Sequence, residues 1–185
     1  MHVEVFIRQS LPKDFESISQ VVELAFRDEE MSDHHEHVLV GRLRVSDAYV
    51  PELSIVAENG AGQIIGHILL TKIRIEDGEN EEDSLALAPI SVLPKFQNQG
   101  IGSRLIRAAL DKAQNLGYRS VIVLGNPEYY PRFGFRKALE WGIHPPFDIP
   151  EDVFMALELV EGALNPVRGI VKYSEPFNES ASEPM

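Results

Sequence analysis

The chain has 185 residues, of which 44% are hydrophobic and 25% are charged, a composition typical of a single globular domain. Its 17 basic and 29 acidic side chains give a net charge of −12, which argues against binding to nucleic acid or anionic membranes through Lys and Arg. Because it contains no cysteine, disulfides, thiolate metal sites and a cysteine nucleophile are excluded.

The N-terminal part of the chain predicts one strand followed by two helices. Apolar and other side chains alternate over residues 3–8, which indicates a strand. Apolar residues at helical spacing then predict an amphipathic helix over about 14–26. A polar stretch leads to a second, short helix with an apolar face of Val38, Leu39 and Leu43.

Three antiparallel strands are expected next. Residues 53–58 and 64–75 are rich in β-branched side chains, and the turn signal Asn59-Gly60-Ala61-Gly62 between them predicts a hairpin. Residues 76–83 are acidic and are expected to form a solvated loop. The apolar run 85–93 that follows predicts the third strand.

The second half of the chain predicts a crossover helix and more strands. A helix is expected over 101–116, with Gly117 at its left-handed C-terminal position. Residues 120–124 (Ser-Val-Ile-Val-Leu) predict a buried strand, parallel to the run 85–93 because a single helix separates the two. Further strands are expected near 135, over 153–160 and over 169–173. This order predicts an α+β fold with a mixed, mostly antiparallel sheet flanked by helices.

One domain is expected over residues 1–173. Residues 174–185 are acidic and are expected to form a loose tail. The N-terminus shows no secretory signal, and no apolar run reaches the ~20 residues of a membrane span. We therefore expect a cytoplasmic protein.

The junction between the third strand and the crossover helix carries a phosphate-binding signal. A helix N-terminus presents unpaired N–H groups and a positive dipole end, and glycine lets the backbone approach an anion closely. The side chains of Gln97 and Arg104 are candidate additional donors. The alternative is a glycine-rich turn that merely starts a helix. The candidate ligand-binding residues are Gln97, Asn98, Gln99, Gly100, Ile101, Gly102 and Ser103.

Two other nucleotide-binding motifs are excluded. A dinucleotide-binding fingerprint requires a third glycine where this chain has Leu105, and an acidic residue near the position of Arg119 and Ser120. A Walker loop requires Gly-Lys-Ser or Gly-Lys-Thr, and neither triplet occurs in the sequence.

The spacing Gln97-x-x-Gly100-x-Gly102 resembles the Gln/Arg-x-x-Gly-x-Gly/Ala motif of the GNAT superfamily of N-acetyltransferases. The later run Tyr129-Tyr130-Pro131-Arg132-Phe133-Gly134-Phe135 is similar to the family's Tyr-x-x-x-Gly-Phe element and looks most like a branch of predicted acetyltransferases. The order of elements over 3–135 also resembles the family's order. The resemblance implies a GNAT-like acyl-CoA N-acyltransferase fold with one parallel strand pair.

The resemblance also implies roles for individual residues. The loop 97–103 would bind the pyrophosphate of acetyl-CoA. Backbone groups of Ile90, Ser91 and Val92 would line the pantetheine arm and face the thioester. Tyr130 would be the general acid that assists departure of the thiolate.

Three other positions are interpreted from their residue types. Pro89 has no N–H for a strand ladder, so it predicts a bulge or an edge. Tyr129 is expected to be a core residue. Many family members have a CoA-contacting Asn about seven residues before the tyrosine, whereas Asn126 lies only four before Tyr130, where Val123 holds the expected position. We keep Asn126 as a cofactor-binding candidate and expect a short helix between it and Tyr130.

The sequence names no general base. His34, His35, Glu36 and His37 cluster before the second predicted helix, in the region that shapes the acceptor site in the resembled family. Their spacing suits a metal poorly, because zinc ligands on a helix lie four residues apart. A polar helix start and a wall of the acceptor site are the other interpretations. His67, within a predicted strand, is expected to be structural.

These observations predict an acetyl-CoA-dependent N-acetyltransferase in which an amine attacks the thioester directly in a ternary complex, without a metal. The alternative is a non-catalytic acyl-CoA-binding module on the same fold, acting as a sensor or regulatory surface. The acceptor is expected to be a small-molecule or peptide amine. The oligomeric state is open, with a homodimer among the options.

Overall fold

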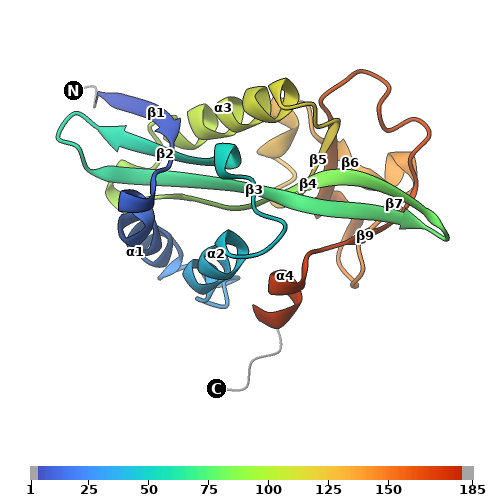
Figure 1. The fold of residues 1–185 in the computed structure, drawn as a ribbon, viewed down its shortest axis with the longest axis horizontal. Coiled ribbons are helices and arrows are strands. Elements are labelled where there is room, and N and C mark those ends of the chain that lie inside the picture. The colour runs from blue at the N-terminus through green and yellow to red at the C-terminus, as the bar shows by residue number, and fades with distance from the viewer. Residues whose placement is uncertain (1–3, 181–185) are drawn as a thin grey trace.

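The computed structural model describes residues 4–180. Within this range, nine strands form one mixed sheet, accompanied by four α-helices and several short 3₁₀ turns (Figure 1). The strands are β1 (Val5–Gln9), β2 (Ser54–Asn59), β3 (Ile64–Asp77), β4 (Asn80–Val92), β5 (Ser120–Leu124), β6 (Arg136–Lys137), β7 (Ile143–His144), β8 (Phe154–Glu158) and β9 (Gly169–Lys172). The helices are α1 (Phe15–Phe26), α2 (Glu36–Arg44), α3 (Ile101–Asn115) and α4 (Glu175–Ser180). None of these helices is long and apolar enough to cross a membrane.

The sheet runs in the order β1-β2-β3-β4-β5-β8-β6, with β9 beside β3 and β7 beside β9. β4 and β5 are parallel, through the pairs Leu85–Val121 and Ala86–Ile122, which confirms the predicted crossover. β7 and β9 make a second, two-residue parallel contact that was not predicted. The remaining neighbours are antiparallel, so the mixed, mostly antiparallel sheet is confirmed.

Helices cover both faces of the sheet. α3 lies along one face, and α1 and α2 lie along the other (Figure 1). The predicted apolar stripe of α3 is buried, apart from Leu116, which falls past the helix end and is 42% exposed. Each fully buried aliphatic side chain contributes roughly 1.5–3 kcal/mol to stability. The buried side chains of α3 are Ile101, Leu105, Ile106, Ala109, Leu110 and Ala113.

The acidic segment 76–83 is the tip of a long β3–β4 hairpin, so the prediction of a loop was wrong. The hairpin turns at Gly78, whose φ is +63°. β9 pairs with residues 74–76 on the other edge of β3, and Arg74 Nη1 lies 3.1 Å from Glu81 Oε2. The strands extend because a segment distant in sequence supplies a second set of hydrogen bonds, which acidic composition does not reveal.

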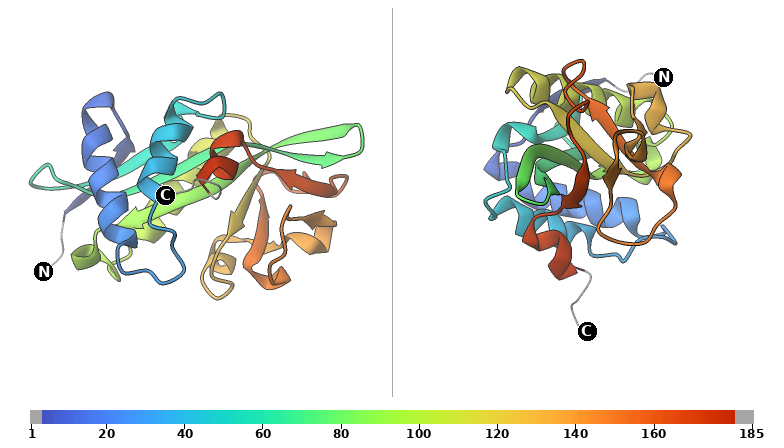
Figure 2. Two further views of the ribbon diagram at one scale, coloured as in Figure 1. Left: turned by 90° about the horizontal axis from the view of Figure 1, so that it is seen from below. Right: turned by 90° about the vertical axis from the view of Figure 1, so that its right-hand side faces the viewer.

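The tail predicted to be loose over 174–185 differs from the structure in its first part. α4 forms there and packs against α2 (Figure 2). Pro176 is buried, and the ring of Phe177 lies 5.2 Å from that of Tyr173. The acidic composition of the segment did not indicate that Pro176 and Phe177 pack against other parts of the folded chain. Residues 181–185 lie outside the described residues.

A chain of polar side chains is buried between the strands. His67 is fully buried, and its Nε2 lies 3.1 Å from Ser54 Oγ, which accepts a 2.7 Å hydrogen bond from Ser10 Oγ. Nδ1 of His67 has no partner among the described residues. Burial, with the nearby charge of Arg44, lowers the pKa of His67 to about 3. His67 therefore has the structural role expected from its place in a strand.

The buried imidazole should make the fold sensitive to acid. In the unfolded chain His67 titrates near 6.5, so below that pH the unfolded state binds a proton that the folded state excludes until the pH nears 3. The stability contributed by neutral His67 is complete above pH 6.5 and falls as the pH drops, by up to about 1.4 kcal/mol per pH unit. Urea unfolding at pH 7 and pH 5 measures this loss. We expect His67→Leu to lose about 2 kcal/mol less than the wild type between these pH values, whereas equal losses would contradict a neutral buried imidazole.

Candidate active site

β4 and β5 pair at only two positions and then separate. Within the described residues, β4 continues to Val92 paired only with β3, and β5 continues to Leu124 paired only with β8. We call these diverging ends, residues 87–92 and 123–124, the β4–β5 fork. Main-chain groups on the inner sides of the fork have no strand partner, so they are available to a ligand.

A bulge in β4 lies within the fork. Ile68 and Leu70 on β3 are two residues apart, whereas their partners on β4, Ile90 and Leu87, are three residues apart. The extra residue falls at a position where Pro89 has no N–H to donate. The bulge predicted from Pro89 is confirmed, and a bulge of this kind changes the direction of the strand at the point where it leaves β5.

α3 begins without a side-chain cap. Its N-cap residue, Gly100, has a left-handed backbone with φ +82°, and Asn98 is also left-handed with φ +62°. Arg104 N donates to Gly100 O at 3.2 Å, so the N–H groups of 101–103 have no carbonyl within the helix. A Cβ built on Gly100 would meet no atom within 4 Å. The helix start therefore combines free donors with open space, which suits an anion.

Polar side chains in and next to this loop donate hydrogen bonds to main-chain carbonyls of the protein. Gln97 Nε2 donates to Val92 O at 3.0 Å, which ties the loop to the end of β4. Gln99 Nε2 donates to a main-chain carbonyl four residues earlier at 3.4 Å, and Arg104 Nη2 donates to Val5 O at 3.1 Å. Gln97 and Arg104 were predicted as candidate donors to a phosphate, but here both side chains have other partners. Among the described residues, the main-chain N–H groups of 101–103 have no carbonyl partner within the helix and are the donors that best suit an anion here.

The fork and the start of α3 adjoin each other. Ile90 Cδ1 lies 4.0 Å from the position that a Cβ on Gly102 would take. Ile90 and Val92 are half-buried, while Ser91 is 4% exposed and its Oγ has no hydrogen-bond partner among the described residues. The residues predicted for the pantetheine arm and those predicted for the pyrophosphate are therefore neighbours in the structure.

Tyr130 lies against the end of β5. Its ring packs edge-to-face on Tyr129 and Phe135, at centroid distances of 5.2 and 5.7 Å, and the residue is 8% exposed. Burial, and to a lesser extent the neighbouring Tyr129, raises the pKa of Tyr130 to about 12. The phenol is therefore protonated at neutral pH, as a general acid must be.

Tyr129 reaches the start of α3, which the sequence did not predict. Its Oη lies 3.3 Å from Ser103 Oγ and 3.4 Å from the Cβ position of Gly102. The Arg132 guanidinium stacks over its ring, 4.5 Å from the centroid. Tyr129 packs against the core, as expected, but its hydroxyl belongs to the candidate site. The sequence signal was a pair of adjacent tyrosines, which does not tell where each hydroxyl points.

Asn126 holds the turn that carries the two tyrosines. Its Oδ1 accepts a 2.8 Å hydrogen bond from Glu128 N, and its main-chain oxygen accepts from the N–H groups of Tyr129 and Tyr130 at 3.1 and 3.2 Å. The short helix predicted between Asn126 and Tyr130 is absent: residues 127–129 form a turn, and a 3₁₀ helix begins only at Tyr130 and ends at Phe133. The contacts give Asn126 a local structural role, and its contact with a cofactor stays a prediction.

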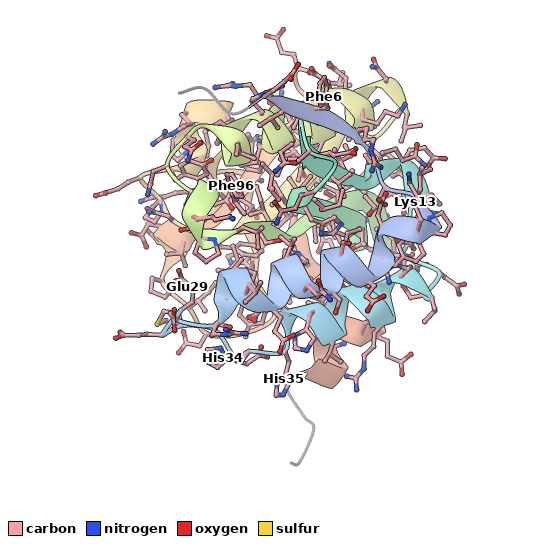
Figure 3. The ribbon with its side chains drawn as sticks, turned by 90° about the vertical axis from the view of Figure 1, so that its left-hand side faces the viewer. Phe6, Lys13, Glu29, His34, His35 and Phe96 are labelled. Atoms are coloured by element: carbon pink, nitrogen blue, oxygen red, sulfur yellow. The ribbon has the colours of Figure 1, made fainter. Side chains whose placement is uncertain are left out.

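The histidine cluster shapes the connection between α1 and α2. His34 Nδ1 lies 3.0 Å from Phe26 O, His35 N donates to Asp33 Oδ1 at 2.9 Å, and Ser32 Oγ lies 2.6 Å from the Glu36 carboxylate. Figure 3 shows Glu29, His34 and His35 spread along this connection. Within residues 4–180 no three His, Asp or Glu side chains gather as a metal-binding group. The contacts favour a polar helix start.

A surface hollow of about 640 Å³ lies elsewhere on the molecule. Its lining includes Ser84 and Tyr118, near the paired ends of β4 and β5, and includes no residue of the fork or of the loop 97–103. This hollow is therefore separate from the candidate site, which is identified by its main-chain geometry.

Comparison with known proteins agrees with this geometry. Residues 18–135 match the model of the Acetyltransferase (GNAT) family. The chain is 32% identical over 174 residues to the N-acetyltransferase YhbS of Escherichia coli K12, covering 94% of this chain and 99% of that protein. The crystal structure of E. coli YhbS in complex with CoA is similar with a TM-score of 0.85 and 30% identity, over 96% of this chain and 94% of that one. A GNAT acetyltransferase from Brucella melitensis, solved with acetyl-CoA, is similar with a TM-score of 0.76 and 35% identity, over 95% and 99% of the two chains.

Proposed function

Since the chain belongs to the GNAT acetyltransferase family, we propose that it transfers the acetyl group of acetyl-CoA to a primary amine that attacks the thioester directly, with both substrates bound. The observation that carries this proposal is the junction between the uncapped start of α3 and the β4–β5 fork. Similarity over nearly the whole chain to proteins solved with CoA or acetyl-CoA supports the choice of donor.

Acetyl-CoA fits the residues that are present. The N–H groups at the start of α3 and the positive end of its dipole suit a pyrophosphate, and the space beside Gly100 is open. The fork would receive the pantetheine arm along Ile90, Ser91 and Val92. Within the described residues, the main-chain groups on the inner side of the fork have no strand partner, which leaves them for a ligand.

The reaction forms one C–N bond and breaks one C–S bond. An amine that has lost its ammonium proton, whose pKa is ~10, attacks the carbonyl carbon of the thioester. A main-chain N–H in the fork stabilises the negative charge that develops on the carbonyl oxygen. Tyr130 gives its proton to the departing sulfur, the surplus proton of the new amide nitrogen passes to solvent, and solvent returns one proton to the Tyr130 phenolate. The products are an N-acetylated amine and the free thiol of CoA.

Charge near the start of α3 favours the donor at contact range, although the whole protein is acidic. The net charge of −12 opposes a polyanionic donor at long range, but local donors at the start of α3 act where salt screens them least. Arg107 and Arg132 add positive charge nearby, stacked over Phe133 and Tyr129. Acidic side chains elsewhere on the protein would attract a cationic amine.

Release of thiol from acetyl-CoA across a panel of amines tests the proposal. The panel should include polyamines, amino sugars and peptides, with mass spectrometry to identify the acetylated product. We expect at least one amine to raise thiol release well above hydrolysis without an amine. Calorimetric binding of acetyl-CoA with no acetylated amine would favour a non-catalytic acyl-CoA-binding module. Absence of acetyl-CoA binding would contradict both functions.

A further inference from the structure

Gly125 is the first residue after the β5 arm of the fork. It directly follows β5, and its N–H donates to Val153 O at 2.9 Å. Its backbone is not in the left-handed region, so its conformation is one that any residue adopts without strain. The reason for a glycine here lies in its surroundings.

The ring of Tyr130 occupies the space that a side chain at 125 would need. A Cβ built on Gly125 would lie 2.4 Å from Cε2 of that ring, 3.0 Å from Cδ2 and 3.3 Å from Cζ. Distances this short are not tolerated between carbon atoms, because optimal contacts are at 3.5–4.0 Å. The ring therefore rests directly on the main chain at the end of β5.

The other sides of the Tyr130 ring are also closed. Phe135, which is 1% exposed, packs edge-to-face at 5.7 Å, and Tyr129 packs edge-to-face at 5.2 Å. The main-chain N–H of Tyr130 is held by Asn126 O at 3.2 Å. A Cβ at 125 would have to move a ring that is itself packed on Tyr129 and Phe135, and a packed core yields little.

We infer that Gly125 is a positioning residue, whose missing side chain lets the Tyr130 ring seat against the β5 arm and so fixes where its hydroxyl stands relative to the fork. This inference rests on the role of Tyr130 in the proposed function. A displacement of about 1 Å in a reacting group can cost about 100-fold in rate. The donor-binding N–H groups at the start of α3 are on another element, which is linked to this ring through Tyr129.

Gly125→Ala should therefore lower kcat about 10-fold to 100-fold, with the Kd and KM for acetyl-CoA changed less than about threefold. Gly41→Ala is the matched control, because a Cβ on Gly41 in α2 would meet nothing within 4 Å. In the Tyr130→Phe background, adding Gly125→Ala should reduce kcat no further, because the hydroxyl it positions is gone. Additive losses in the double variant, or a normal kcat in Gly125→Ala, would overturn the inference.

An NMR measurement separates this inference from the proposed function. In protein with labelled tyrosine, the Tyr130 ring signal is assigned by its loss in Tyr130→Phe. We expect Gly125→Ala to shift that signal while those of Tyr118 and Tyr173 stay in place. An unshifted Tyr130 signal contradicts the positioning role even if the enzyme is active, and a wild type that acetylates no amine contradicts the proposed function alone.

A second variant covers the case in which Gly125→Ala fails to fold. Phe135→Leu makes room behind the ring, so the double variant Gly125→Ala/Phe135→Leu should recover a cooperative unfolding transition. Its kcat should stay below that of Phe135→Leu alone, since the ring retreats from the β5 arm. Equal kcat values for these two proteins would contradict the inference.

Discussion

Replacing Tyr130 by phenylalanine is expected to lower kcat about 100-fold or more, with the Kd for acetyl-CoA unchanged within about twofold. The substitution removes one oxygen from a packed ring, so the departing thiolate loses its proton donor while the aromatic contacts with Tyr129 and Phe135 remain. Steady-state kinetics with a saturating amine and acetyl-CoA measure the loss, and calorimetry measures the affinity.

Tyr173→Phe is the control for this substitution. Tyr173 is also buried and burial raises its pKa to about 12, but it packs on Phe147 and Phe177, away from the fork. Its replacement should leave kcat unchanged. An unchanged kcat in Tyr130→Phe, with chemistry shown to be rate-limiting by the absence of a burst, would refute the role of the phenol.

The pH dependence of the wild type follows from the same pKa. A general acid must be protonated, so Tyr130 loses its function only as the pH rises toward about 12. The amine must be deprotonated, so activity should rise with pH up to the pKa of the acceptor. We expect kcat/KM to rise from pH 7 to pH 9 with no falling limb in that interval. A falling limb centred near 8 that disappears in Tyr130→Phe would contradict the raised pKa.

Gly100→Asp is expected to weaken acetyl-CoA binding about 100-fold or more. It places a carboxylate at the N-terminus of α3, where the pyrophosphate is proposed to bind, and two like charges about 4 Å apart repel by about 4 kcal/mol near a protein surface. Gly100→Asn is the matched control, because it has the same shape without the charge and because Asn tolerates a left-handed backbone. We expect the Asn variant to lose tenfold or less.

Thermal unfolding tests whether such a loss is local. Aspartate is a favourable N-cap residue and its charge complements the helix dipole, so Gly100→Asp should unfold at no lower a temperature than Gly100→Asn. Weaker binding with equal or higher stability isolates the charge effect. If both variants bind acetyl-CoA equally well, the donor's phosphates do not lie at the start of α3.

The local helices and strands, and the two motifs at the site, could be predicted from the sequence. Hydrophobic periodicity predicted α1 and α3, and the glycine-rich loop and Pro89 marked a helix start and a bulge that the structure contains. Patterns of this kind are readable because they depend on residues within one turn or one strand. A motif identified Tyr130, but no sequence pattern predicted which residues surround its ring.

Contacts between segments distant in sequence formed two elements that the sequence did not predict. The acidic hairpin tip formed because β9, almost a hundred residues away, pairs with β3. Composition likewise missed α4, whose Phe177 finds Tyr173 only in the folded chain. Hydrogen bonds and ring contacts between distant segments leave no periodic trace in the sequence.

The same division holds at the site itself. The glycine-bearing helix start after a proline-interrupted strand could be predicted from the sequence, because those residue types restrict the backbone locally. Only the folded chain decided that Gln97 and Arg104 have other partners, that Tyr129 reaches Ser103, and that the Tyr130 ring rests on the main chain of Gly125. These contacts could not be predicted because side-chain direction and close packing depend on neighbours that the sheet brings together from distant parts of the sequence.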